Sequence, residues 1–376
     1  MTGCCLIPKQ IIEIETNGDI YLCGCSEYLP KVVGNILDID SFEEVHQLEL
    51  AKKVIHSTTI SKTFEHCVKI PLSGNLLCGF DKTHDKTLMK GVDGTKPEEI
   101  KIVVGYDDSC NLECPSCRLY PLSNYTKTVG NVLFNSDKFS NTDLIYKAIQ
   151  KHGKESVYNV AKRYKTIARN FNDIKELDKK VVQLINNYKK PAQIEFGASG
   201  DAFFSQSVKN CIDKLEYNSE HRYSFKTNGL MMKSIIPTLK IKDSIANINI
   251  SIDAGTKETH ERLRTGSSWN QLLSNINWLM QLPNRPTVMG AFVLQKDNFR
   301  EIPKILKLFL GDIGIDNVYF IPLRKPSHWS DAEYTEKNIL SKLHPCYQEF
   351  TEIINSIPRV YKDRTDIFKY LQYLQK

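Results

Sequence analysis

Residues 99–118 read Glu99-Ile-Lys-Ile-Val-Val-Gly105-Tyr-Asp-Asp-Ser-Cys110-Asn-Leu-Glu-Cys114-Pro-Ser-Cys117-Arg118. The opening run is apolar and β-branched, which predicts a buried strand. Three cysteines with the spacing C-x3-C-x2-C follow directly, and no fourth cysteine comes soon after them. In parallel α/β folds, catalytic and binding residues lie at the C-terminal ends of the strands. The stretch therefore predicts a parallel sheet with a metal-binding loop at one strand end.

The spacing of Cys110, Cys114 and Cys117 indicates which metal group they hold. Three thiolates on one short loop can ligate three irons of a [4Fe–4S] cluster and leave the fourth iron open. A structural zinc instead needs four ligands, usually in two pairs separated by a longer spacer. The loop is therefore interpreted as an iron–sulfur site, with zinc or unligated thiols as the alternatives.

Downstream of the loop, strand patterns and helix patterns alternate, which is typical of a parallel α/β sheet. Together with the strand at Ile102 they predict six βα units, fewer than the eight of a closed barrel. The connection between Cys117 and Ala192 is long for one βα unit and has helical patterning, so a helical insertion is expected at about 119–172. The further strands are expected at 192–196, 222–225, 247–253, 287–294 and 317–321.

Composition sets the class of protein. The chain has 376 residues, 41% of them apolar and 25% charged, with a net charge of +6. These values are typical of a globular protein with two domains. No apolar run of about eighteen residues and no signal-peptide pattern is present, so a cytoplasmic protein without membrane contact is expected. Eleven cysteines in a reducing compartment predict metal ligands or free thiols.

The cysteine loop resembles the signature of the radical SAM superfamily, although Ser116 stands where that family usually has an aromatic residue. The resemblance implies that Cys110, Cys114 and Cys117 hold a [4Fe–4S] cluster. It also implies that the amine and carboxylate of S-adenosylmethionine chelate the open iron. The fold implied is an α/β partial (βα)6 TIM-type barrel over residues 91–325, followed by C-terminal helices in an extension at 326–376.

Four later motifs resemble the family's S-adenosylmethionine pocket. The turn Gly197-Ala-Ser-Gly-Asp201 is similar to the glycine-rich motif that binds the methionine amine, and Thr227-Asn228-Gly229 to a turn at the pocket floor. Ser251-Ile-Asp253, with His260 and Arg264, resembles the ribose and carboxylate contacts, where Arg264 is expected to grip the carboxylate with two donors. Gln295 and Asn298 are expected near adenine or substrate. The implied cofactor-binding residues are Ser199, Gly200, Asp201, Thr227, Asn228, Ser251, Asp253, Arg264 and Gln295.

The N-terminal cysteines resemble the opening of a SPASM module, an auxiliary iron–sulfur domain of radical SAM maturases. The similarity covers Cys5-x12-Gly18-x4-Cys23 and continues at Gly34-Asn-Ile36. It implies a small cysteine-rich α+β domain at 1–90 that holds one auxiliary cluster. Four spaced thiolates suit zinc equally well, so a zinc fold is the alternative. The implied ligands are Cys5, Cys23, Cys67 and Cys78, with Cys4 and Cys25 as alternates.

The expected activity is reductive cleavage of S-adenosylmethionine to a 5′-deoxyadenosyl radical, which abstracts hydrogen from a substrate. The resemblance implies a peptide or peptidyl substrate first, then a protein, sugar or other small molecule, and a flavodoxin, ferredoxin or reductase as electron donor. Cys346 is a candidate hydrogen donor to a substrate radical. The alternatives are an RNA-modifying radical SAM enzyme, which no recognisable RNA-binding module supports, and a non-enzymatic zinc-binding interaction protein.

Overall fold

The computed structural model describes most of the predicted barrel and parts of the N-terminal region. The predicted helical insertion at 119–172 lies almost entirely outside it. Described are residues 7–15, 18–23, 32–60, 99–107, 109–117, 171–197, 200–326, 329–368 and 370.

A single nine-stranded sheet organises the described chain, in the order β3-β2-β1-β4-β5-β6-β7-β8-β9. From β1 to β9 every neighbouring pair is parallel, and only β1–β2 and β2–β3 are antiparallel. The mixed α/β fold with a mostly parallel sheet is therefore confirmed. The strands are β1 Ile11–Ile14, β2 Asp19–Tyr21, β3 Gly34–Asn35, β4 Ile100–Val104, β5 Ala192–Phe196, β6 His221–Thr227, β7 Ile245–Ser251, β8 Thr287–Leu294 and β9 Asn317–Pro322.

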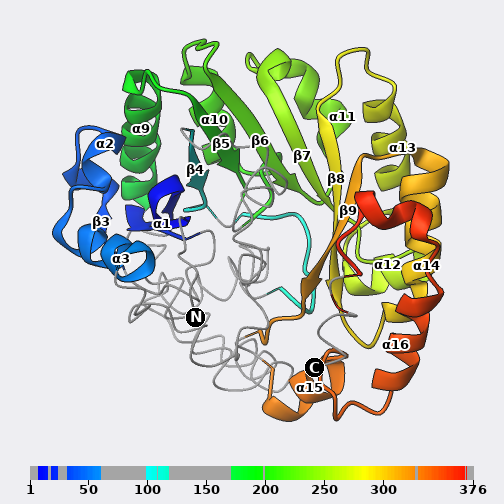
Figure 1. Cartoon of the computed structure of the whole chain (residues 1–376). Coiled ribbons are helices and arrows are strands. Elements are labelled where there is room, and N and C mark those ends of the chain that lie inside the picture. The colour runs from blue at the N-terminus through cyan, green and yellow to red at the C-terminus, as the bar shows by residue number, and fades with distance from the viewer. Residues whose placement is uncertain are drawn as a thin grey trace, which may run out of the picture.

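Helices cover the outer side of the sheet, which curves into an arc (Figure 1). Polar caps define several helix starts: Ser205 accepts the Val208 amide before α10, and Ser268 accepts the Gln271 amide before α13. None of the described helices combines the length and apolarity needed to cross a membrane. The α-helices are α1 Ile7–Gln10, α2 Phe42–Val45, α3 Glu49–Thr59, α9 Phe171–Asn187, α10 Gln206–Lys214, α11 Met232–Ile235, α12 Lys257–Leu263, α13 Trp269–Met280, α14 Ile302–Ile305, α15 Asp331–Lys337 and α16 Tyr347–Ser356.

Shorter helical turns complete the connections. One is a π-helix, η6 Leu306–Ile313, which continues α14 and ends at Gly314 with φ +81°. The others are the 3-10 helices η2 Ile36–Asp38, η3 Ile236–Thr238, η4 Lys242–Ser244, η5 Phe299–Glu301 and η7 Arg359–Arg364.

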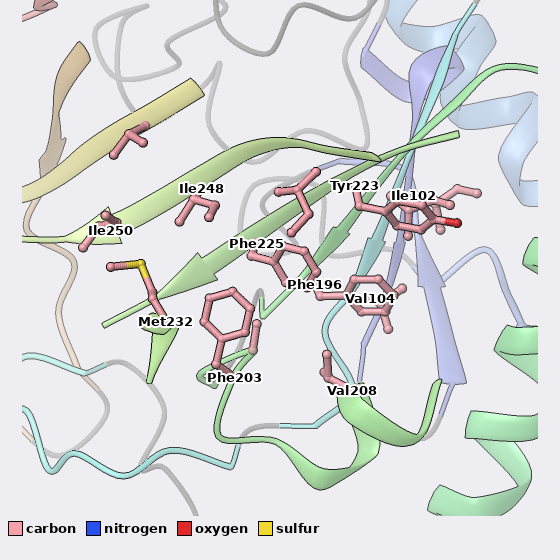
Figure 2. Packing of buried hydrophobic residues seen from close by; sticks show 14 of the residues in the cluster. Ile102, Val104, Phe196, Phe203, Val208, Tyr223, Phe225, Met232, Ile248 and Ile250 are labelled. Carbon is pink, nitrogen blue, oxygen red and sulfur yellow. The ribbon is translucent and has the colours of Figure 1, made fainter. Parts of the chain in front are cut away.

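Alternation along the strands gives the sheet two chemically different faces. The helix-covered face is apolar: Phe196 and Phe225 stack at 5.8 Å, and Phe203 packs on Phe225 at 5.0 Å (Figure 2). Along β5, β6 and β7, and at Lys101 of β4, the opposite, inner face carries polar side chains at the alternate positions. We define it by Lys101, Gln193, Glu195, Ser224, Lys226, Asn247 and Asn249.

All six predicted strands of the barrel are present, with ends shifted by at most three residues. The N-terminal segment joins the barrel sheet, because β1 pairs in parallel with β4. A run of only four residues gives too short a pattern for this pairing to be read from sequence. The C-terminal helices are also present, as α15 and α16. The division at residues 90 and 325 stays a prediction.

Candidate functional site

The cysteine loop leaves β4 at its C-terminal end and runs across the inner side of the arc, where Figure 1 shows it in cyan. Backbone hydrogen bonds fix it at two places. The Asp201 amide donates to the Ser109 carbonyl at 2.9 Å, and the Glu113 amide donates to the Thr265 carbonyl at 3.0 Å. The loop is thus held between the connection after β5 and the segment after α12, as the position of a strand-end site requires.

The three thiols lie half-buried and are not paired in disulfides. Burial raises the pKa of Cys110 to about 11 and that of Cys114 to about 11. Among the described residues no three Cys, His, Asp or Glu side chains gather as a single metal ion would require. Cluster ligands need not gather in this way, because each thiolate bonds its own iron. Three thiolates on one loop are the donor set that an iron–sulfur cluster uses, and the ligand role of these cysteines stays a prediction.

Asp201 uses its carboxylate to tie two turns together. Its Oδ1 accepts the amides of Phe203 and Phe204 at 3.0 and 3.1 Å. Its Oδ2 accepts the Thr227 hydroxyl at 2.9 Å and the Asn228 amide at 2.6 Å. Burial raises the pKa of Asp201, and the four hydrogen bonds oppose that rise. The amine of S-adenosylmethionine, which is predicted to contact Asp201, would thus meet a carboxylate whose two oxygens each already accept two donors.

The glycines of the same turn serve the sheet as well as the site. Gly197 has φ +89°, and a Cβ there would lie 2.5 Å from the Lys226 carbonyl oxygen, so only glycine fits. Gly200 lies half-buried in the turn, and Ser199 is outside the described residues. Their contacts with S-adenosylmethionine stay predictions.

Asn228 reaches from the end of β6 to the cysteine loop. Its Nδ2 donates to Asn111 Oδ1 at 2.7 Å and lies 3.8 Å from Cys110 Sγ, while its Oδ1 accepts the Leu230 amide at 3.0 Å. Thr227, predicted beside it, donates to Asp201 and accepts the Gly229 amide. The structure therefore brings the second predicted turn to the first cysteine.

Asp253 and Arg264 form the second contact to the loop. β7 ends at Ser251, and Asp253 adopts φ +34°, so the expected alternation of Ser251 and Asp253 on one strand does not hold. Asp253 Oδ2 pairs with Arg264 Nη2 at 2.7 Å, and Arg264 Nη1 lies 3.9 Å from Cys114 Sγ. The Nε of Arg264 is buried without a partner among the described residues.

This arrangement changes what Arg264 offers a ligand. Burial alone would lower the pKa of Arg264, but Asp253, followed by Cys114, outweighs that effect and raises it. Asp253 pairs with Nη2 and Cys114 lies beside Nη1, whereas Nε is a buried donor with no partner among the described residues. The expected contact of Arg264 with a carboxylate through two donors stays a prediction.

Other polar residues near this site support the backbone. Asn298 donates its Nδ2 to the carbonyls of Asp253 and Val293, and its Oδ1 accepts the Gln295 amide. His260 is fully buried and lies between the Ile252 carbonyl at 3.1 Å and the Ser267 hydroxyl at 2.8 Å. Gln295 is buried too, and its Nε2 has no partner within the described chain. Of these three, Gln295 retains a donor for a ligand.

The sequence reading missed a charged group on the inner face. Glu195 Oε2 pairs with Lys101 Nζ at 3.0 Å, and Glu195 Oε1 pairs with Lys226 Nζ at 2.6 Å. The Glu195 side chain is only 2% exposed, whereas that of Lys226 is 41% exposed. The signal in the sequence was a charged residue inside each of three apolar strands, at positions that alternate with the core.

Two predicted cysteine sites are only partly described. Cys23 is half-buried and packs beside Ile11 and Val103, while Cys4, Cys5, Cys25, Cys67 and Cys78 are outside the described residues. Cys346 precedes α16, where the Arg300 guanidinium lies 3.7 Å from its sulfur. This contact joins the start of α16 to η5, and the role of Cys346 as hydrogen donor stays a prediction.

No protein-family model matches the sequence, and no curated protein sequence matches it. Among solved structures, "Native anSMEcpe with bound AdoMet" is 15% identical with a TM-score of 0.35, covering 60% of this chain and 52% of that one. Streptococcus suis SuiB bound to S-adenosylmethionine is 12% identical with a TM-score of 0.39, covering 72% and 52%.

SuiB bound to its precursor peptide SuiA is also similar, at 12% identity and a TM-score of 0.38, with 88% of this chain and 65% of that one covered. The chain spans about half the length of the first of these structures. All are distant matches to S-adenosylmethionine-bound or peptide-bound structures of radical SAM enzymes. The α/β fold itself rests on the strand order and pairing of this chain, which agree with the fold expected from its sequence.

Proposed function

We propose that this protein is a radical SAM enzyme. The observation that carries the proposal is the position of Cys110, Cys114 and Cys117 at the C-terminal end of β4. Asn228 and Arg264, both predicted as pocket residues, lie within 4 Å of two of these sulfurs. The cysteine loop, the turn after β6 and the segment after α12 lie far apart in the sequence, and they come together at the proposed cluster ligands.

The residues present fit the proposed cofactors. The three cysteines supply thiolates for a [4Fe–4S] cluster. Arg264 Nε and Gln295 Nε2, which are buried and have no partner among the described residues, are the proposed donors to S-adenosylmethionine. When bound, the cluster supplies the electron that cleaves S-adenosylmethionine to a 5′-deoxyadenosyl radical. Asp201 and Asp253 hold the turns that carry Asn228 and Arg264, so the protein orients the site before any ligand arrives.

A peptide or peptidyl residue is the proposed substrate class. The inner face carries one half-exposed donor, the Lys226 ammonium, and two buried acceptors, the side-chain oxygens of Asn249 and Gln193, which have no partner among the described residues. A peptide backbone carries both kinds of partner, a carbonyl and an N–H, in every residue. The inner face therefore matches the polar groups of a peptide better than those of an apolar ligand.

The test of this function is cleavage of S-adenosylmethionine by anaerobically reconstituted, reduced protein. We expect 5′-deoxyadenosine and methionine from the wild type, and neither from the variant with Cys110, Cys114 and Cys117 all changed to alanine. Cys211→Ala is the matched control, because this thiol is buried in the helix-covered core. Cleavage that persists in the triple variant would refute the assignment.

We also propose that Cys5, Cys23, Cys67 and Cys78 hold an auxiliary cluster. The wild type should then contain about eight irons per chain, the sum of two four-iron clusters, and the triple variant about four. A fully thiolate-ligated cluster has no open iron, so the triple variant should show no change in its EPR spectrum when S-adenosylmethionine is added. One equivalent of zinc and no iron in that variant would identify a zinc fold instead.

A further inference from the structure

Two nitrogen donors from different parts of the chain lie beside sulfur atoms of the cysteine loop. Asn228 Nδ2, after β6, is 3.8 Å from Cys110 Sγ, and Arg264 Nη1, after α12, is 3.9 Å from Cys114 Sγ. Both distances allow N–H···S hydrogen bonds, which are longer than bonds to oxygen because sulfur is larger. Each of the first two cysteines thus has its own donor.

Each donor is held by a buried carboxylate. Asp201 is 2% exposed and accepts the backbone N–H of Asn228 at 2.6 Å. Asp253 is 4% exposed and pairs with the Arg264 guanidinium at 2.7 Å. Asp253 is itself fixed by the Val293 amide at 2.6 Å. The donors are therefore positioned by the folded chain and do not depend on a ligand for their placement.

We propose that Arg264 and Asn228 set the reduction potential of the cluster held by the cysteine loop, through the thiolates of Cys114 and Cys110. This inference rests on the proposed radical SAM function. Reduction adds one negative charge to a cluster, and hydrogen bonds to its sulfurs and nearby positive charge stabilise the reduced form. Arg264 supplies a charge and a donor, and Asn228 supplies a donor alone.

Asp253 makes the sign of the effect testable. Its carboxylate partly neutralises Arg264, so Asp253→Asn should leave the guanidinium charge uncompensated and raise the potential. Asparagine retains an oxygen for the Val293 amide and tolerates the φ of +34° found at this position. Arg264→Met should instead lower the potential, because both the charge and the donor are lost. Shifts of opposite sign are not expected from a purely structural role.

The experiment is a redox titration of the full reconstituted chain, following the EPR signal that responds to added S-adenosylmethionine. We expect Arg264→Met to disfavour reduction about tenfold, a shift of about 59 mV for a one-electron couple. Asn228→Ala should produce a smaller shift of the same sign. Arg262→Met is the matched control: it removes an arginine two residues away whose side chain is 55% exposed and pairs with Asp297, so its potential should equal that of the wild type.

Wild-type potentials in both iron-loaded Arg264→Met and Asp253→Asn would overturn the inference and leave the proposed function intact. If Arg264→Met does not retain iron, the reduction potentials of Asp253→Asn and Asn228→Ala test the inference instead. Unchanged potentials in both of these variants would overturn the inference. A wild type that binds no iron, or whose signal does not respond to S-adenosylmethionine, would instead remove the proposed function. The two failures are therefore distinguishable.

Discussion

The helix-covered face and the inner face of the sheet bury opposite kinds of side chain. Phe196 and Phe225 stack on the helix-covered face, while Glu195, which precedes Phe196 in β5, lies on the inner face between two lysines. Parallel strands covered on both faces usually read as continuous apolar runs. β5, β6 and β7 alternate instead, and such departures are expected where a fold serves a function.

Electrostatic interactions explain how a charged residue can be buried on the inner face. Burial alone would raise the pKa of Glu195, but Lys101 and Lys226 outweigh it and lower the pKa to about 2. A charged group with two partners costs less to bury than an isolated one, yet an apolar residue would usually cost less still. The helix-covered face thus stabilises the fold, whereas the inner face is kept polar at some expense of stability.

The largest expected effect is on the helix-covered face. Phe225→Ala removes a fully buried ring that packs on Phe196 and Phe203. It should lower the free energy of unfolding by about 3–5 kcal/mol, measured by urea denaturation, because it leaves a cavity between strands and helices. Tyr217→Ala, at a side chain 79% exposed, should change it little. A Phe225→Ala cost below about 1 kcal/mol would contradict this packing.

Glu195→Gln tests the inner face, with an expected loss of up to about 3 kcal/mol at pH 7. The pKa of Glu195 is depressed in the folded state, so its contribution is present above the unfolded-state pKa and is lost as pH falls toward 2. The difference in stability between wild type and variant should therefore shrink between about pH 4.5 and pH 2. Glu336→Gln removes a carboxylate from an exposed pair with Lys296 and is the control. A pH-independent difference for Glu195→Gln would contradict the charge assignment.

A polar network behind the sheet should have an intermediate effect. Asp178 accepts the Tyr106 hydroxyl at 2.6 Å and also the Ser207 hydroxyl, which joins α9 and α10 to the start of the cysteine loop. Asp178→Ala removes the carboxylate that accepts from both buried hydroxyls and should cost about 1–3 kcal/mol in thermal or urea unfolding. Asp178→Asn keeps an acceptor and should recover most of that loss. Equal losses in both variants would show that the carboxylate charge matters more than the hydrogen bonds.

These comparisons also show what could be predicted from sequence. The six barrel strands and the cysteine loop were predictable because strand alternation and C-x3-C-x2-C are local patterns. The roles of Asp201 and Asp253 were not, because their partners Asn228 and Arg264 lie elsewhere in the chain. A sequence marks a carboxylate as polar, but only the fold shows whether its oxygens are already occupied.

The smallest expected effect distinguishes neighbouring residues of β7. Ile248 is fully buried on the helix-covered face, and Asn249 is 6% exposed on the inner face. The Asn249 side chain makes no hydrogen bond with the described residues, and its Oδ1 is buried.

Because burying an unpaired amide is unfavourable, Asn249→Leu should leave the free energy of unfolding within about 1 kcal/mol of the wild type, or raise it. Ile248→Ala, one position away, should lower it by about 2–5 kcal/mol in the same urea titration. A loss of 2 kcal/mol or more in Asn249→Leu would mean that Asn249 is bonded within the folded chain. The polar groups of the inner face would then stabilise the fold, and their availability to a peptide would no longer be supported.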